Sequence, residues 1–261
     1  MIPRYLISVI ILISAFVIIL PKFLDSGDIS FVIPYINKID QAISTEVIIN
    51  DVNEEEAEKI EDGEAEIQKN ILLNVPFILQ APLGNWSDPR QQDGCEEASV
   101  MMAMRWMQDE IITKQEALKE LLRLVKWQTE EYNEHRDTSA SSTAQRLLKE
   151  YYNHENFRVV YSITAEDIIL ELQAGNLIIT PMDGRELGNP YFTPPGPTRH
   201  MVVIRGYDFD TAEFITNDPG TRRGEEYRYK QDIFFSAIRD YPTGYHEKIN
   251  KIIKAMIVVK K

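Results

Sequence analysis

The sequence predicts an α+β domain, because two kinds of apolar pattern occupy different parts of the chain. Apolar residues at helical spacing dominate between residues 95 and 152. Short runs rich in β-branched and aromatic residues, separated by turn-forming residues, dominate from residue 157 onward. Helices that come first and strands that follow close together are typical of an α+β fold with an antiparallel sheet.

Residues 1–22 are predicted to be an uncleaved signal anchor, that is, a transmembrane helix. Residues 5–20 contain no charged side chain, and Arg4 precedes them. No small-x-small cleavage pattern follows this run, which favours an anchor over a removed signal peptide. Positive charge before the run and acidic residues after it predict that the N-terminus stays in the cytoplasm. We therefore expect a single-pass protein of the cell membrane, with its folded domain on the extracytoplasmic side.

Residues 23–70 are predicted to be an acidic juxtamembrane linker. Residues 1–70 carry 5 Lys or Arg and 13 Asp or Glu, so their net charge of −8 accounts for most of the chain's −13. The acidic residues concentrate at 51–67, where self-repulsion and scarce apolar surface favour a solvated spacer. A calcium-binding tract is the alternative, but the spacing does not match an EF-hand.

Composition also excludes several classes of function. The chain has no basic stripe that would meet phosphate groups, so we expect no nucleic-acid partner. A single cysteine rules out an intramolecular disulfide. Without a CxxC motif or a Cys/His pair, a structural zinc site is not expected either.

Residues 71–261 are predicted to form the folded domain, which opens with an extended segment and a long loop. The residue before a proline is pushed towards β conformation, so Val75-Pro76 predicts an extended segment at 72–80. Residues 81–94 are rich in Pro, Gly, Asn, Asp and Ser and are predicted to be a loop. At its end, Asp93 is the expected N-cap of the first helix.

The remaining elements follow from capping signals and periodicity. Thr113 and Glu116 form a capping box, and Thr164 is placed to cap a later helix. Strand runs are short and are bounded by turn formers. The predicted helices are 95–108, 113–126, 139–152, 164–173 and 231–239, and the predicted strands are 157–162, 176–180, 200–208, 213–216 and 252–259.

Cys95 is the only cysteine among the 261 residues and is the candidate nucleophile. It follows Gly94 at the predicted start of a helix, where the positive end of the helix dipole favours the thiolate. Glu96 and Glu97 come next, and their negative charge would raise the thiol pKa, so position and local charge oppose one another. A lone cysteine is more often a small buried hydrophobe, so its role depends on finding a base and an orienting group.

His200 is the expected general base, and Asp218 is the expected orienting residue. A cysteine nucleophile needs a group that removes its proton and later protonates the leaving amine, and imidazole does both near neutral pH. His200 opens an apolar strand directly after a Gly/Pro-rich loop, whereas the other histidines, His135, His154 and His246, lie in charged or terminal stretches. Antiparallel pairing with the strand at 213–216 would bring the turn at 217–220 back to His200. This turn also has favourable turn chemistry of its own, and Asn217 is a second candidate for the imidazole partner.

Acyl transfer also needs hydrogen-bond donors aimed at the developing oxyanion. The backbone N–H of Cys95, at the start of the predicted helix, is one such donor. A glutamine side chain upstream of the cysteine is the usual second donor in thiol hydrolases. By residue type alone, Gln80, Gln91 and Gln92 all qualify.

Four pieces of the sequence, in this order, resemble the C39-like peptidases, relatives of the bacteriocin-leader-processing C39 proteases that share the papain-like fold. The pieces are Val75–Gln80, Gly94–Ser99, His200–Tyr207 and Asn217–Pro219. The resemblance spans roughly residues 71–240 and implies a papain-like fold. It also implies Cys95 as nucleophile, His200 as base, Asp218 as orienting residue and a glutamine as oxyanion donor. We assign that donor to Gln80, which follows the Val-Pro-Phe segment, while Gln91 and Gln92 stay in contention.

The chain departs from the family pattern in two respects. Many relatives carry Gly-Cys-Gly-Pro-Thr-Ser where this chain has Gly-Cys-Glu-Glu-Ala-Ser at 94–99. No Walker A motif follows the domain, so a fused ABC transporter and a double-glycine leader substrate are not implied.

The expected function is therefore that of a membrane-anchored extracytoplasmic cysteine peptidase or amide hydrolase acting on a peptide or protein. No metal or organic cofactor is expected. The loop at 182–199, with Tyr191 and Phe192, is expected to wall the cleft beside His200. Two alternatives remain: an inactive papain-like module that binds peptides or cell-wall components, and a transglutaminase-type acyl transferase with the same triad order.

Overall fold

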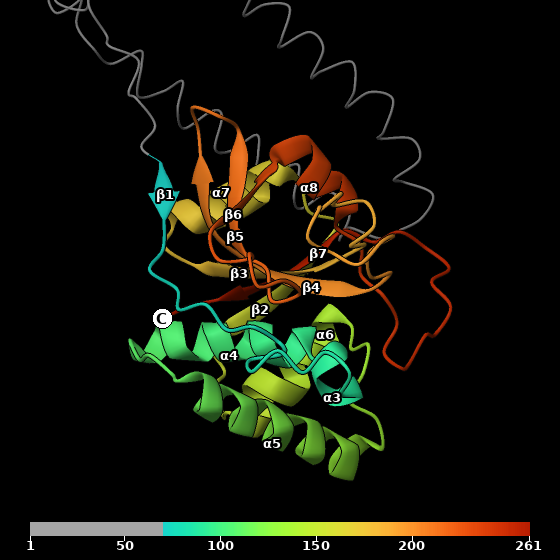
Figure 1. Ribbon diagram of the computed structural model, residues 1–261. Coiled ribbons are helices and arrows are strands. Elements are labelled where there is room, and N and C mark those ends of the chain that lie inside the picture. Colours follow the sequence, from blue (N-terminus) through green and yellow to red (C-terminus); the bar gives the residue numbers. More distant parts are fainter. Residues whose placement is uncertain (1–69) are drawn as a thin grey trace, which may run out of the picture. The chain divides into compact units, whose positions relative to one another are not determined.

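The computed structural model describes residues 70–261. The predicted signal anchor at 1–22 and almost all of the predicted linker at 23–70 lie outside the described residues. Within the part that is described, no helix has the length and apolar composition of a membrane span. The predicted α+β class is confirmed there, since helices cover both faces of one antiparallel sheet (Figure 1).

A seven-stranded sheet forms the centre of the fold, and all of its strand pairs are antiparallel. The strands follow one another across the sheet as β2 (Phe157–Tyr161), β7 (Ala255–Val259), β3 (Leu177–Met182), β4 (His200–Asp208), β5 (Glu213–Asn217) and β6 (Tyr227–Lys230). The short strand β1 (Ile71–Leu72) pairs with the far end of β4. Strand β4 is buried along its whole length, so both faces of the sheet are covered at this point.

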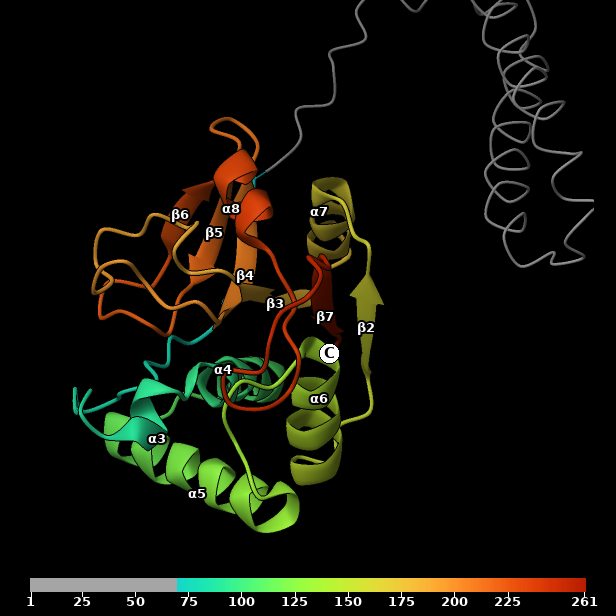
Figure 2. The ribbon, with the colours of Figure 1, turned by 90° about the vertical axis from the view of Figure 1, so that its right-hand side faces the viewer.

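Successive side chains of the central strands point into two different cores, as the pleat of a β-strand requires. On one face, Met201 and Val203 of β4 pack with side chains of the helices α4, α5 and α6. On the other face, Val202 and Ile204 pack with side chains of α7 and α8. Figure 2 shows the two groups of helices on opposite sides of the sheet. The bounds are α4 (Cys95–Gln108), α5 (Lys114–Tyr132), α6 (Ala140–Thr143), α7 (Ala165–Gln173) and α8 (Gln231–Ala237).

The capping signals in the sequence identify where these helices begin. Thr113 accepts a hydrogen bond from the backbone N–H of Glu116, whose carboxylate accepts one from the backbone of Thr113, and α5 then runs past the predicted end at residue 126. Thr164 forms the same reciprocal pair with Asp167 at the start of α7. Helix α6 continues directly into a π-helical segment, η2 (Ala144–Tyr151), so the two together fill the helix predicted at 139–152.

The loop predicted at 81–94 contains a short helix instead, α3 (Pro89–Gln92). Asp88 accepts a hydrogen bond from the backbone N–H of Arg90, and Pro89 occupies the first turn, where its missing N–H costs nothing. Asp93 consequently lies at the C-cap of α3, and the N-cap of α4 is Gly94, which offers no side-chain bond. The prediction that Asp93 caps α4 is therefore wrong.

Two further features differ from expectation. Strand β6 is additional to the predicted strands, although Tyr227 and Tyr229 alternate with charged residues in the manner of a half-buried strand. The extended segment at 72–80 pairs with the sheet only at its start, where β1 lies very close to β4. A Cβ at Gly206 would lie 2.2 Å from the carbonyl oxygen of Ile71, so only glycine allows this approach.

Candidate active site

Helix α4 places Cys95 in its first turn, on the floor of a cavity of about 380 Å³. The cysteine is 7% exposed. The first N–H groups of a helix have no partner within the helix, so the backbone N–H of Cys95 is a donor at the same place. Besides Cys95, the cavity is lined by His200, by Gln80, Trp86 and Gln92, by Asp93, Glu96 and Asp137, and by segments of the loops around Pro195, Gly220 and His246.

Strand pairing brings His200 and Asp218 together. His200 is the first residue of β4, and Val203 pairs with Asn217 at the end of β5, so the next residue, Asp218, returns alongside the start of β4. Nε2 of His200 lies 2.7 Å from Oδ1 of Asp218, and both side chains are buried. This contact engages Nε2, which leaves Nδ1 as the ring nitrogen available for proton transfer.

The carboxylate of Asp218 is surrounded by donors. Its Oδ1 also accepts a hydrogen bond from the backbone N–H of Gly220, and its Oδ2 accepts one of 2.7 Å from the hydroxyl of Tyr229. The Tyr229 hydroxyl in turn accepts from the side-chain amide of Asn189 at 2.7 Å. Burial by itself would raise the pKa of Asp218, but the charge of His200 and these hydrogen bonds outweigh it, and the pKa is lowered.

Asn217, the other candidate partner of His200, is engaged elsewhere. Its side-chain amide donates to the backbone carbonyl of Val75 at 3.2 Å, and its oxygen accepts from the backbone N–H of Glu226. Asn217 therefore ties the extended segment at 72–80 to the sheet, and its side chain makes no hydrogen bond to the imidazole among residues 70–261.

The ring of His200 is also held by packing. Phe192 meets it edge-on, with the ring centroids 5.4 Å apart. Gly220 lies so close that a Cβ there would be 2.8 Å from Cε1 of His200. Of the two aromatic residues expected to wall the cleft, Phe192 lines the cavity, whereas Tyr191 packs against Tyr227.

The thiol of Cys95 faces acidic side chains. Its Sγ donates a hydrogen bond of 3.0 Å to Oε2 of Glu96. Burial, the charge of Glu96 and the charge of Glu97 together hold the thiol pKa well above its usual value, while the backbone N–H of Met201 acts in the opposite direction. The opposing effect of the two glutamates that the sequence predicts is thus the stronger one in this structure.

The three candidate glutamines lie in different surroundings. Gln80 is buried and lines the cavity, and its amide Nε2 donates to the carbonyls of Gln91 at 3.1 Å and Gln92 at 2.5 Å. Gln92 lines the cavity too. Gln91 is buried away from the cavity lining and donates to Asp88. In this arrangement the Gln80 amide braces the end of α3, just ahead of Cys95, with both of its donors directed at the backbone.

Several residues of the site escape sequence reasoning. His246 and Asp137 line the cavity, and the backbone N–H of His246 donates to the carboxylate of Asp137 at 2.6 Å. Tyr229 reaches Asp218, and Tyr241 reaches Glu96 from the segment between α8 and β7. Only the alternation around Tyr229 offered a signal, because the other contacts arise from tertiary packing.

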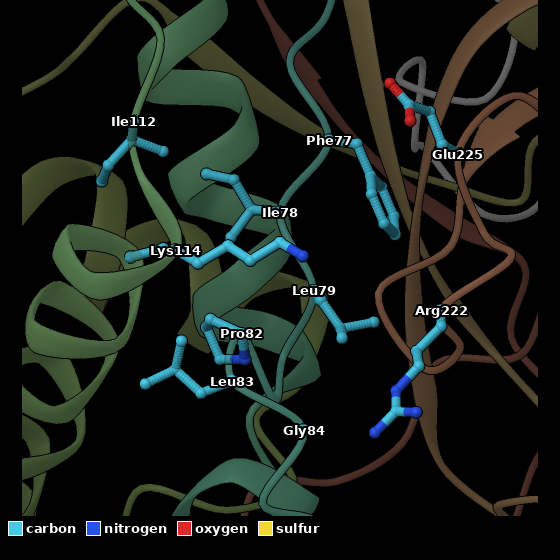
Figure 3. Close-up of a pocket in the computed structure, with 11 residues that line it drawn as sticks. Phe77, Ile78, Leu79, Pro82, Leu83, Gly84, Ile112, Lys114, Arg222 and Glu225 are labelled. Carbon is cyan, nitrogen blue, oxygen red and sulfur yellow. The ribbon is translucent and has the colours of Figure 1, made fainter.

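A larger cavity, of about 660 Å³, is lined by Phe77, Ile78 and Leu79, which precede Gln80 in the chain (Figure 3). Apolar side chains and the charged residues Lys114, Arg222 and Glu225 share its lining. Because none of Cys95, His200 and Asp218 lines it, the chemistry assigns the candidate site to the smaller cavity. Between residues 70 and 261, no group of three or more His, Cys, Asp or Glu side chains is arranged to hold a metal ion.

Comparison with known proteins identifies the family to which the sequence is similar. The sequence model of the Peptidase_C39 like family matches residues 72–248. A crystal structure of a proposed C39-like peptidase from Bacillus anthracis is similar, with 16% sequence identity and a TM-score of 0.46. That likeness covers 74% of this chain and 98% of the other. None of the curated proteins matches the chain.

Proposed function

Since the chain belongs to the Peptidase_C39 like family, we propose that it is a cysteine peptidase that hydrolyses peptide or amide bonds in the cavity at the start of α4. Cys95 is the nucleophile, His200 the general base and acid, and Asp218 the residue that orients the imidazole. The observation that carries this proposal is the buried His200–Asp218 pair, 2.7 Å apart, on the same cavity as the thiol. A base oriented by a third group beside a nucleophile is the arrangement that covalent acyl transfer requires.

The reaction would proceed through a thioester. The thiol proton moves to Nδ1 of His200, Sγ bonds to the substrate carbonyl carbon, and the carbonyl electrons move onto its oxygen. When this oxyanion collapses, the C–N bond breaks and the leaving nitrogen takes the proton from Nδ1. A water molecule then gives a proton to Nδ1 and bonds to the carbonyl carbon, the C–S bond breaks, and sulfur takes the proton back.

Stabilisation of the oxyanion is assigned to the backbone N–H of Cys95 and the side chain of Gln80. Gln80 would have to turn one amide N–H from a backbone carbonyl towards the substrate, since both donors face Gln91 and Gln92 in the structure. Gln92 is the competing donor because it lines the same cavity. Gln80→Ala and Gln92→Ala separate the two, because loss of an oxyanion donor lowers kcat by about a hundredfold or more.

The direct test uses the single cysteine. Hydrolysis of a peptide library should disappear in Cys95→Ala and in His200→Ala, and iodoacetamide should label the wild-type protein at one site only. His154→Ala is the matched control, since this half-buried histidine lies outside the cavity and its loss should leave the rate unchanged. Undiminished hydrolysis in Cys95→Ala would end the proposal.

A second candidate function is a non-catalytic module that binds peptides or cell-wall components in the same cavity. The observation that favours it is the thiol bonded to Glu96 with a raised pKa, because a neutral thiol is a weak nucleophile. The two functions differ in turnover: a binding module retains peptides without cleaving them, and Cys95→Ala leaves its affinity unchanged.

The proposal extends to location. The uncharged run at 5–20, with Arg4 before it, supports a peptidase anchored in the cell membrane that works on its extracytoplasmic side. A reporter enzyme fused after residue 261 tests this, and activity of a reporter that functions only in the cytoplasm would contradict it.

A further inference from the structure

Glu96 is a buried acid for which the proposed reaction has no role. It is 1% exposed, and its Oε2 receives the hydrogen bond from the Cys95 thiol. The thiol at rest is therefore directed at a carboxyl group on its own helix, and not into the solvent of the cavity.

The other oxygen of Glu96 is held by two donors from distant parts of the chain. The backbone N–H of Thr138 donates to Oε1 at 3.2 Å, and the hydroxyl of Tyr241 donates to Oε1 at 2.9 Å. Tyr241 is itself buried, and its hydroxyl lies 3.4 Å from the backbone carbonyl of His200. With Oε1 occupied in this way, the carboxyl plane is fixed and Oε2 is aimed at Sγ.

The ionisable groups around this contact are mostly acidic. Glu97 follows in the same helical turn, and its own pKa is raised by burial and by the charge of Glu96. Burial is also the main cause that raises the pKa of Glu96, with a contribution from Asp137. Asp93 lies ahead of the helix on the cavity wall, and His200 faces the same cavity from β4.

We propose that Glu96 is a positioning residue that holds the Cys95 thiol in a protonated resting state. Activation then requires the S–H group to break its bond to Oε2 and turn to Nδ1 of His200, where the proton is transferred. The inference rests on the proposed function, because it concerns the same nucleophile. Its consequence is a thiol that reacts slowly with alkylating agents and oxidants until a substrate occupies the cavity.

The test is a pH titration of the thiolate by its ultraviolet absorbance, with the spectrum of Cys95→Ser subtracted to remove the tyrosines. Because the chain has one cysteine, the difference reports Cys95 alone. In Glu96→Gln the midpoint should fall by about one to three pH units, the effect expected for a neighbouring like charge. The acidic limb of the kcat/KM profile should move in the same direction.

Glu97→Gln is the matched control. Glu97 is equally buried, but it is hydrogen-bonded to Gln128 and not to the thiol. The thiol midpoint should therefore move less in Glu97→Gln than in Glu96→Gln. Equal midpoints in Glu96→Gln and the wild type, or a larger shift in Glu97→Gln, would overturn the proposal.

A measurement on the wild type keeps the question decidable even if Glu96→Gln does not fold. The infrared S–H stretching band should be present at neutral pH, displaced to low frequency by the bond to a carboxyl group, and absent in Cys95→Ser. A missing band means a thiolate, and a band at the frequency of a free thiol means no contact with Glu96; either contradicts the proposal. These outcomes are independent of hydrolysis in Cys95→Ala, so failure here and failure of the proposed function are distinguishable.

Discussion

The two walls of the cavity both bury carboxyl groups, but only the β4–β5 wall combines several donors with a neighbouring positive charge, that of His200. Asp218, on the β4–β5 side, is fully buried and receives hydrogen bonds from His200, Gly220 and Tyr229. Glu97, at the start of α4, is equally buried, yet it receives one from Gln128 and leaves Oε2 without a partner in residues 70–261. The pKa of Asp218 is lowered, and that of Glu97 is raised well above its usual value.

This difference shows that burial alone does not decide the charge of an acid. Burial opposes ionisation at both positions, and only a nearby cation with several donors reverses its effect. The β4–β5 wall therefore keeps an anion that can hold an imidazolium. At the α4 wall, burial and the neighbouring acidic charge raise the pKa of Glu97 and of the Cys95 thiol.

The largest effect is expected from Asp218→Asn. The amide no longer carries the charge that supports His200, so kcat/KM should fall by about a hundredfold or more. Asp208→Asn is the control, because Asp208 is also mostly buried, near the other end of β4, where it pairs with Arg228. Similar rates for Asp218→Asn and the wild type would remove the functional contrast between the two walls.

Gly220→Ala should reduce kcat/KM by about tenfold, a common result when a reacting group is displaced by a fraction of an ångström. Its new Cβ would start 2.8 Å from Cε1 of His200, so the ring must shift away from its place. Gly175→Ala is a suitable comparison: that position has no neighbour within 4 Å, and its positive φ costs stability without touching the cavity. Equal losses of activity in the two variants would show that the crowding at Gly220 is unimportant.

Tyr229→Phe should have a smaller effect, a loss of a few-fold in kcat/KM together with about 1–3 kcal/mol in unfolding free energy, as expected when a buried hydrogen-bonding partner is removed. Without the hydroxyl, Oδ2 of Asp218 loses its donor, so the pKa of Asp218 rises. Asp218 stabilises the fold above its ordinary pKa of 3.8 and ceases to do so as the pH falls through its lowered value. Acid unfolding of Tyr229→Phe should therefore begin at a higher pH than that of the wild type.

Glu97→Gln should have the smallest effect on kcat/KM, and its main effect should be on the pH dependence of stability. An acid whose folded pKa is raised binds more protons in the folded state, so it destabilises the fold as the pH rises above its ordinary value of 4.5. The thermal midpoint of the wild type should fall between pH 5 and pH 8 for this reason, and Glu97→Gln should show a smaller fall. Glu130→Gln, at an exposed position, should behave like the wild type. If the thermal midpoint of Glu97→Gln fell with pH as steeply as that of the wild type, Glu97 would not titrate in this range.

The sequence predicts more of the contacts on the β4–β5 side of the cavity than of those on the α4 side. His200 begins one apolar strand, and Asp218 directly follows the next strand along the chain. Because two such strands pair as an antiparallel hairpin, the contact between these residues can be predicted from a short stretch of sequence. The hydrogen-bond donors around Asp218 do not follow from it. Tyr229 belongs to a four-residue strand with only a short alternation, and Asn189 lies in an irregular loop.

The start of α4 is held by contacts with residues that are distant in the sequence. The negative charge beside Cys95 is visible in the sequence, but its hydrogen-bond partners are not. Thr138 and Tyr241 are separated from Glu96 by 42 and 145 positions, and no periodicity links them. The cap of α4 differs from the prediction for a related reason, because Asp88-Pro89 opens a short helix that takes Asp93 as its C-cap.

The position of β7 has a consequence for the order in which the protein matures. Residues 255–259 form the strand between β2 and β3, which do not pair with each other, so the sheet is divided until this last strand is inserted. During synthesis on the ribosome, α4, His200 and Asp218 all emerge before it does. The segment that carries Tyr241 and His246 leads directly into β7 and is also held by hydrogen bonds to Pro181 and Asp137, so it joins the cavity wall only after β3 and the helical part have been made.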